Sequence, residues 1–237
     1  MNVGSMDFWL ALLEIIWVNI LLSGDNAVVI ALAARSLPPQ QQRTAIVAGS
    51  AGAIVLRIVL TLVAAQLLLM PWLKTVGALL LVYIGVSLLL PEGEDEGEAK
   101  QYNSLWAAIR TILVADLVMS LDNVVAVAAA AHGNVPLLII GLAISIPLVI
   151  FGSTMLLKVI ERFPVIVWLG AALLGWIAGD LFINDGALHV EAAEAAMGMS
   201  HHAAELAMGI LGAIIVVALG RFFIMRHKAK EASNSPA

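Results

Sequence analysis

Seven long runs of apolar residues constrain this chain more than any other feature of its sequence. Each run is long enough, at roughly 20 residues, to cross the hydrocarbon layer of a bilayer as a helix. Hydrophobic residues make up 62% of the 237 residues and charged residues only 12%, too few to coat a soluble globule of this size. Lipid excludes open sheet edges, so we expect helices. The predicted spans are 8–34, 44–70, 72–90, 105–131, 135–157, 164–184 and 203–225.

Composition also argues against several classes of protein. Cysteine is absent, which excludes disulfides, thiolate zinc sites and iron–sulfur clusters. The net charge of -5 and the scattered basic residues argue against a nucleic-acid partner. The sequence shows no nucleophile–base pair, phosphate-binding glycine loop or HExxH motif, so we expect neither an enzyme nor a prosthetic cofactor. Residues 1–7 contain no Lys or Arg, so we expect no cleaved signal peptide.

Two near copies of a polar motif interrupt the apolar runs. They are Ser23-Gly24-Asp25-Asn26 in the first run and Ser120-Leu121-Asp122-Asn123 in the fourth. A gapless alignment of the two regions places Asn19 opposite Asp116, so a second polar position also repeats. A charge within the hydrocarbon is costly and by default indicates a functional site. Polar groups in a duplicated membrane chain are typical of a transporter whose site lies at the repeat interface.

The distribution of basic residues predicts the orientation of the chain. Cytoplasmic loops collect Lys and Arg, and all of the 12 Lys and Arg residues except Arg57 and Lys74 fall on one side of the predicted topology. The N-terminus is therefore expected outside and the C-terminus in the cytoplasm. The first run then enters from outside and its copy enters from inside, so the two repeats are inverted.

The expected fold is an all-α membrane protein with seven transmembrane helices, formed by an inverted three-plus-three repeat and one C-terminal helix. We expect a single transmembrane domain over 1–237. Its parts are repeat 1 at 8–90, an acidic cytoplasmic loop at 91–104, repeat 2 at 105–184, an external loop at 185–202, the last helix at 203–225 and a cytoplasmic tail at 226–237.

The helical rise of about 1.5 Å per residue predicts the depth of the polar residues. Asn19 and Asp116 are expected near the midplane of the bilayer. Asp25 is expected towards the cytoplasmic leaflet and Asp122 towards the outer one, which makes an intramembrane hydrolase with a shared aspartate proton a weaker alternative. The four residues together suggest a path across the membrane.

Helical periodicity predicts which polar side chains share a face. Residues seven apart lie on one face of a regular helix, so Asn26 groups with Asn19 and Asn123 groups with Asp116, whereas each motif aspartate points about 100° away. A single compact site would need a broad cavity or local unwinding. Gly24 suits such unwinding and Leu121 does not.

Arg57 is a basic residue within the second apolar run. An unpaired guanidinium is improbable in hydrocarbon, so we expect Arg57 to pair with one of the carboxylates. It could occupy the site as a surrogate cation when the metal leaves, or it could form a fixed structural ion pair. Glu14 and Asp180 are accessory candidates, because each could extend the path towards the outside.

Carboxylate and amide oxygens are hard donors, which suit Mn, Mg or Ca. The alternative is that these polar residues only hydrogen-bond helices together. The predicted metal ligands are Asp25, Asn26, Asp116, Asp122 and Asn123, supported by Asn19.

Two acidic loops could raise the local concentration of cations, although solvated linkers have the same composition. The cytoplasmic loop contains the acidic run 92–98. His201 and Glu205 in the external region have the spacing of a metal-ligand pair, which is weak support on its own. The acidic and histidine residues of the external region are Asp185, His189, Glu191, Glu194, His201, His202 and Glu205.

The segments SGDNAVVIALA and SLDNVVAVAAAAHGN resemble the TerC family of bacterial integral membrane proteins, in particular its YjbE-like branch. The resemblance covers roughly residues 8–225. The family takes its name from tellurium resistance, and several members are implicated in manganese efflux. The resemblance implies a multi-pass protein of the bacterial inner membrane that exports Mn(II), with Asp25, Asn26, Asp122 and Asn123 at the motif positions.

The expected function is therefore a secondary transporter that exports a divalent metal, Mn(II) in particular, by exchange with protons. The alternative is a membrane scaffold or tellurium-type stress-resistance factor that recruits partners without transporting metal. The expected partners are the metal ion and the lipid bilayer, and a homo-oligomer is left open.

Overall fold

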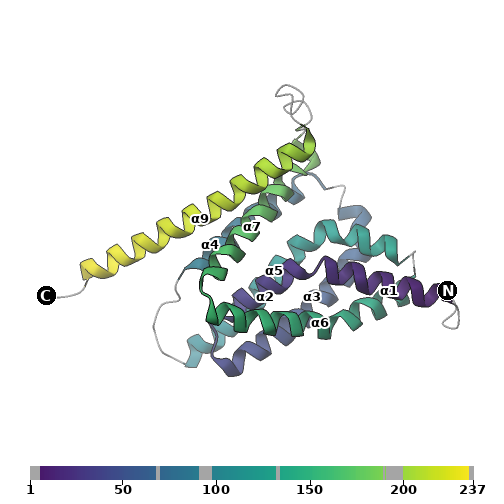
Figure 1. Cartoon of the computed structure of the whole chain (residues 1–237), viewed down its shortest axis with the longest axis horizontal. Coiled ribbons are helices and arrows are strands. Elements are labelled where there is room, and N and C mark those ends of the chain that lie inside the picture. Colours follow the sequence, from purple (N-terminus) through teal and green to yellow (C-terminus); the bar gives the residue numbers. More distant parts are fainter. Residues whose placement is uncertain are drawn as a thin grey trace. The chain divides into compact units, whose positions relative to one another are not determined.

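The computed structural model of the protein describes residues 6–67, 70–90, 98–131, 134–188, 190 and 200–234. Throughout these ranges the structure is helical, as the apolar runs predict, and contains no strand (Figure 1). The helices are α1 Met6–Leu21, α2 Gly24–Ala34, α3 Pro39–Leu67, α4 Leu73–Leu89, α5 Glu98–Ala130, α6 Val135–Arg162, α7 Val165–Ile183, the short 3-10 helix η1 Gly186–Leu188 and α9 His201–Asn234.

Five to six of the seven predicted spans have the length and composition of a membrane crossing within the described residues. Helices α3, α5, α6, α7 and α9 each qualify alone, and α1 with α2 forms a sixth span if the bent pair is counted as one. Helix α4 is apolar but has only 17 residues. Its length of about 26 Å falls short of the roughly 30 Å of hydrocarbon. The described residues therefore support a multi-pass helical membrane protein with five or six candidate spans, and the seventh span stays a prediction.

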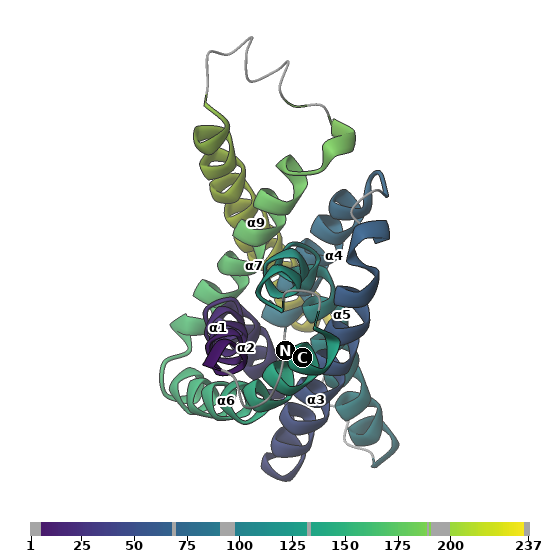
Figure 2. The same ribbon diagram turned by 90° about the vertical axis from the view of Figure 1, so that its right-hand side faces the viewer.

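Helices α1, α2, α3, α5 and α6 pack into one compact unit. Helix α6 lies along both α1 and α2 (Figure 2), and α3 lies along α5. Glycines permit these close contacts, because a Cβ at Gly49 would meet the side chain of Ile112 and one at Gly141 would meet that of Ile15. This first unit contains both copies of the polar motif.

Helices α4, α7 and α9 form a second compact unit. Helices α7 and α9 approach backbone to backbone, because a Cβ at Gly175 would meet the carbonyl of Gly212 and one at Gly179 would meet that of Met208. Small residues at such a crossing are typical of helix pairs in membranes. The prediction that 1–237 forms a single transmembrane domain stays a prediction.

Asp185 caps the start of α4 from the segment that follows α7. Its carboxylate accepts hydrogen bonds from the backbone N–H and the hydroxyl of Thr75, both at 2.8 Å, and from the N–H of Ala187 at 2.9 Å. The residue before α4, Trp72, has a φ of 63° and no side-chain cap of its own. Asp185 therefore supplies the acceptor that this helix start lacks.

The same contacts change the acidity of Asp185. Burial acts to raise the pKa of this carboxyl, but hydrogen bonds from Ala187, Thr75 and Trp72 together outweigh it and hold the pKa below the ordinary value of 3.8. A depressed folded-state pKa stabilises the fold above the unfolded-state value, and that stabilisation is lost as the pH falls through the folded-state value.

We predict that Asp185→Ala lowers the free energy of unfolding by about 0.5–2 kcal/mol at neutral pH, because α4 loses its cap. The difference from wild type should be constant between about pH 7 and pH 5 and should shrink below about pH 4. Thermal unfolding in detergent, followed by tryptophan fluorescence, measures the difference in unfolding free energy between the variant and wild type. Glu161→Gln, which removes an exposed carboxylate, is the control. A difference that grows towards acid pH would contradict the capping role.

Candidate functional site

The first copy of the motif lies at a break between two helices. Helix α1 ends at Leu21, α2 begins at Gly24, and their axes differ by 50°. In a continuous helix the N–H of Asn26 would bond to the carbonyl of Leu22, but here it donates to Asp25 Oδ1 at 2.8 Å. Gly24 tolerates the turn without steric cost. This agrees with the prediction that Gly24 suits local unwinding.

The carbonyl of Leu22, freed by the break, becomes a junction between the two motif copies. It accepts the side-chain amide of Asn26 at 3.4 Å and that of Asn123 at 3.3 Å. These two amides occupy equivalent positions in the repeated motif. The break therefore turns a backbone oxygen inward, where residues of both copies meet it.

The second copy lies within a continuous helix. Helix α5 runs from Glu98 to Ala130 through Leu121 without interruption. Leucine lacks the conformational freedom of glycine, so the same motif does not break the helix here. The two copies are therefore similar in sequence and different in backbone structure.

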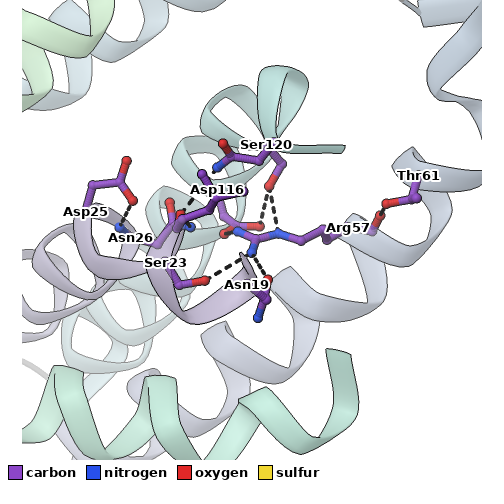
Figure 3. Close-up of polar contacts among 10 residues, drawn as sticks. Asn19, Ser23, Asp25, Asn26, Arg57, Thr61, Asp116 and Ser120 are labelled. Carbon is purple, nitrogen blue, oxygen red and sulfur yellow. Dashed lines mark hydrogen bonds and ion pairs between the residues drawn. The ribbon is translucent and has the colours of Figure 1, made fainter. Parts of the chain in front are cut away.

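A buried ion pair lies beside the break. Arg57 extends from α3, and its NH2 group lies 2.5 Å from Asp116 Oδ1 on α5 (Figure 3). Arg57 is 2% exposed and Asp116 5% exposed, so neither charge is solvated by bulk water. This contact confirms the prediction that Arg57 pairs with a carboxylate.

The guanidinium has three further acceptors. Its NH1 group donates to Asn19 Oδ1 at 2.7 Å and to Ser23 Oγ at 3.2 Å, and its Nε donates to Ser120 Oγ at 3.0 Å. Both serines are buried, and Ser120 also donates to Asp116 Oδ2 at 3.3 Å. Figure 3 shows the acceptors converging on Arg57 from α1, from the break and from α5. We call Asn19, Ser23, Arg57, Asp116 and Ser120 the arginine cluster.

Asp25 and Asn26 lie next to the arginine cluster. Asp25 is half-buried and interacts electrostatically with both Arg57 and Asp116. Asn26 is 3% exposed, and its Oδ1 has no hydrogen-bond partner among the described residues. A buried amide oxygen without a donor is costly in a protein interior. Asn26 Oδ1 is therefore available to bind a cation.

The structure brings together some of the predicted site residues. Asn19 and Asp116 share Arg57, and Asn26 and Asn123 share the carbonyl of Leu22. Asp122 is exposed on α5. The role of each of these residues as a metal ligand stays a prediction.

The two accessory candidates belong to different units. Glu14 is exposed on α1. Asp180 belongs to the second unit, where its backbone carbonyl accepts the side-chain amide of Asn184 at 3.0 Å. The accessory role of both carboxylates stays a prediction.

Ser23 and Ser120 accept hydrogen bonds from Arg57, a role that the sequence did not predict for them. Each lies four residues after the polar residue with which it shares Arg57, namely Asn19 in one case and Asp116 in the other. Residues four apart share a helix face, so this spacing was the available signal.

The start of α9 shows one carboxylate near two histidines. Glu205 lies 3.4 Å from His201 Nε2 and 3.5 Å from His202 Nδ1, and it accepts the side-chain amide of Asn184 at 3.2 Å. Among the described residues, no group of three or more His, Cys, Asp or Glu side chains is arranged to hold a metal ion. The predicted residues His189, Glu191 and Glu194, and residues 92–97 of the acidic run 92–98, lie outside the described residues.

Comparisons with known proteins agree with the resemblance seen in the sequence. The profile of the family described as "Integral membrane protein TerC family" matches residues 4–229. A Bacillus subtilis (strain 168) relative, "Uncharacterized membrane protein YjbE", is 44% identical over 179 residues, which are 76% of this chain and 82% of the relative. No solved structure matches the chain.

Two further relatives are more distant. "Uncharacterized membrane protein YceF" of Bacillus subtilis (strain 168) is 29% identical over 72% of this chain and 69% of its own length. "UPF0053 inner membrane protein YoaE" of Escherichia coli (strain K12) is 27% identical over 78% of this chain but only 39% of its own length.

The buried ion pair generates a prediction about stability. Asp116→Asn should lower the free energy of unfolding by about 3–5 kcal/mol, because it leaves the Arg57 guanidinium buried without a counter-charge. The double variant Arg57→Met with Asp116→Leu should recover most of this loss, since it removes both charges. Thermal unfolding in detergent measures the stability of the single and the double variant. Glu161→Gln, which changes an exposed carboxylate, is the control. A double variant less stable than Asp116→Asn would contradict the assignment.

Proposed function

Since the chain belongs to the TerC family of integral membrane proteins, we propose that it is a secondary transporter that exports a divalent metal cation, with Mn(II) as the cargo. The observation that carries the proposal is the group of buried and half-buried oxygen atoms at and beside the break between α1 and α2. Broken helices with polar groups at mid-membrane depth are typical of the substrate sites of transporters. The protein acts in this proposal as a carrier and not as an enzyme.

The chemistry of the oxygen atoms defines the class of cargo. Asp25 and Asp116 contribute carboxylates, Asn26 contributes an amide oxygen without a described donor, and Leu22 contributes a backbone carbonyl. These are hard donors, which suit Mn, Mg and Ca. The choice of Mn(II) among these ions rests on what the family resemblance implies. Asn19 and Asn123 support the site, and Asp122 is proposed as a station towards the outside.

We also infer that the chain has seven spans arranged as an inverted repeat, with α4 as the third. The pattern of helix packing supports this inference. Helix α6 lies on α1 and α2, and its counterpart α3 lies on α5, which is the exchange that two repeats related by a two-fold axis would produce. The third helices of the two repeats, α4 and α7, also pack on each other. The distribution of Lys and Arg supports an N-terminus outside and a C-terminus in the cytoplasm of a bacterium.

Export against a negative interior requires a source of energy. Each positive charge costs about 2.3 kcal/mol per 100 mV, so a divalent cation costs about 4.6 kcal/mol before any concentration gradient. Carboxylate oxygens bind either a metal ion or a proton. We therefore propose that inward movement of protons drives metal export, with protons replacing the metal on the carboxylates.

The transport proposal predicts the behaviour of acid-interior inverted membrane vesicles. Mn(II) should accumulate inside them, and an ionophore that collapses the proton gradient should slow the accumulation strongly. Asp25→Asn should reduce uptake to the level of vesicles without the protein, because the site loses a carboxylate that binds both metal and proton. Radioactive Mn(II) and a pH-sensitive dye measure the two movements.

Glu161→Gln is the control, since it also removes one carboxylate but lies exposed at the end of α6. Membrane levels of the two variants should match wild type. Full uptake by Asp25→Asn would exclude its role as a ligand. Uptake that continues at full rate after the proton gradient is collapsed, without sodium, would exclude proton exchange.

A further inference from the structure

The Arg57 guanidinium occupies oxygen atoms that a metal ion in this site would need. It donates to the carboxylate of Asp116 at 2.5 Å and to the amide oxygen of Asn19 at 2.7 Å. Its other acceptors are the hydroxyls of Ser23 and Ser120. Carboxylate, amide and hydroxyl oxygens are also the donors that a hard divalent cation selects. Of the proposed metal ligands, Asp116 and Asn19 are held by Arg57, so a metal ion and the guanidinium would compete for these two oxygen donors.

Charge balance prevents the metal ion and the Arg57 guanidinium from occupying the site at the same time. When Asp25 and Asp116 are ionised, they carry two negative charges, and Arg57 neutralises one of them. A divalent cation that joined all three groups would leave an excess positive charge in a buried region, where uncompensated charge is costly. The same cation balances both carboxylates once Arg57 has moved away.

Arg57 can vacate the site only by moving. A guanidinium does not lose its proton in proteins, so it cannot be neutralised in place. Its acceptors lie on α1, at the break and on α5, whereas Arg57 itself belongs to α3. Departure of the guanidinium would therefore release α3 from both copies of the polar motif at once.

We propose that Arg57 is the resident cation of this site and that a divalent cation binds by displacing it. This inference rests on the proposed function and adds a step to it. In the cargo-free protein the guanidinium ties α3 to α1 and α5. In the loaded protein the metal joins α5 to the break between α1 and α2 and leaves α3 out. Because the metal must first displace Arg57, the apparent affinity of the site for the metal is reduced. The metal is therefore released more easily.

The first test is Mn(II) binding by the purified full-length protein in detergent, measured from the electron paramagnetic resonance signal of free MnCl2. Arg57→Gln should bind Mn(II) at least about tenfold more tightly than wild type, since the competing cation is gone. Arg110→Gln is the matched control, because it also removes one arginine charge from the first unit but lies exposed on α5. It should bind as wild type does.

Arg57→Lys separates displacement from simple charge repulsion. The ammonium keeps a positive charge near Asp116, but as a compact point charge it cannot span acceptors on two helices. Displacement predicts an affinity between those of wild type and Arg57→Gln. An affinity equal to wild type would show that only the field of the charge matters and would overturn the proposal. Arg57→Lys retains a partner for Asp116, so it also decides the question if Arg57→Gln does not fold.

Hydrogen exchange of the wild-type protein provides a test that needs no variant. Saturating MnCl2 should speed amide exchange in α3 around residue 57 and slow it around the break at 22–24. Unchanged exchange in α3 while Mn(II) is bound would overturn the displacement step and leave the proposed function intact. A protein that binds no Mn(II) in any form would overturn the proposed function and this inference together.

Discussion

The ion pair between Arg57 and Asp116 is the interaction on which the first unit depends. Transfer of two charges out of water costs several kcal/mol per ion, and only close pairing with further hydrogen bonds offsets that cost. Here the pair is 2.5 Å long, and Asn19, Ser23 and Ser120 satisfy the remaining donors of the guanidinium. The pair requires α1, α3 and α5 to keep one relative position. The apolar side chains around the ion pair therefore pack in a single arrangement of these helices.

The helix break determines how the two motif copies differ in structure. Gly24 allows α1 to end and α2 to begin anew, which releases the carbonyl of Leu22. Leu121 keeps α5 continuous, so the second copy contributes side chains alone. The site is therefore asymmetric although the sequence is repeated. A free backbone oxygen within an apolar span is acceptable only where protein groups satisfy it, and here the amides of Asn26 and Asn123 do so.

Much of the site could be predicted from sequence because charges in hydrocarbon have few acceptable arrangements. The need to pair Arg57, the joint position of Asn19 and Asp116, and the break at Gly24 all follow from that constraint. The sequence could not show which carboxylate Arg57 selects, because the choice depends on the rotation of α3 against α5. The role of Ser23 and Ser120 as acceptors depends on the same packing.

The expectations that need the whole membrane-embedded arrangement stay predictions. Asp122 as a ligand is one of them, because α5 stays helical there and carries Asp122 on an exposed face. The crossing of the bilayer by the run 72–90 is another, because Trp72 lies outside the helix and the 17 residues of α4 begin at Leu73. Apolar composition alone does not indicate where a helix begins. The capping of α4 by Asp185 depends on a residue far along the chain.

The central claim is that the oxygen atoms around Arg57 form a cation site that the guanidinium occupies when no metal is present. Crystals of the protein soaked in MnCl2, with anomalous scattering recorded at the manganese edge, test it most directly. The account predicts an anomalous peak within coordination distance of Asp116 and Asp25, with the Arg57 guanidinium turned away from Asp116. A peak beside His201 and Glu205 alone, or a peak with the Arg57–Asp116 pair intact, would contradict it.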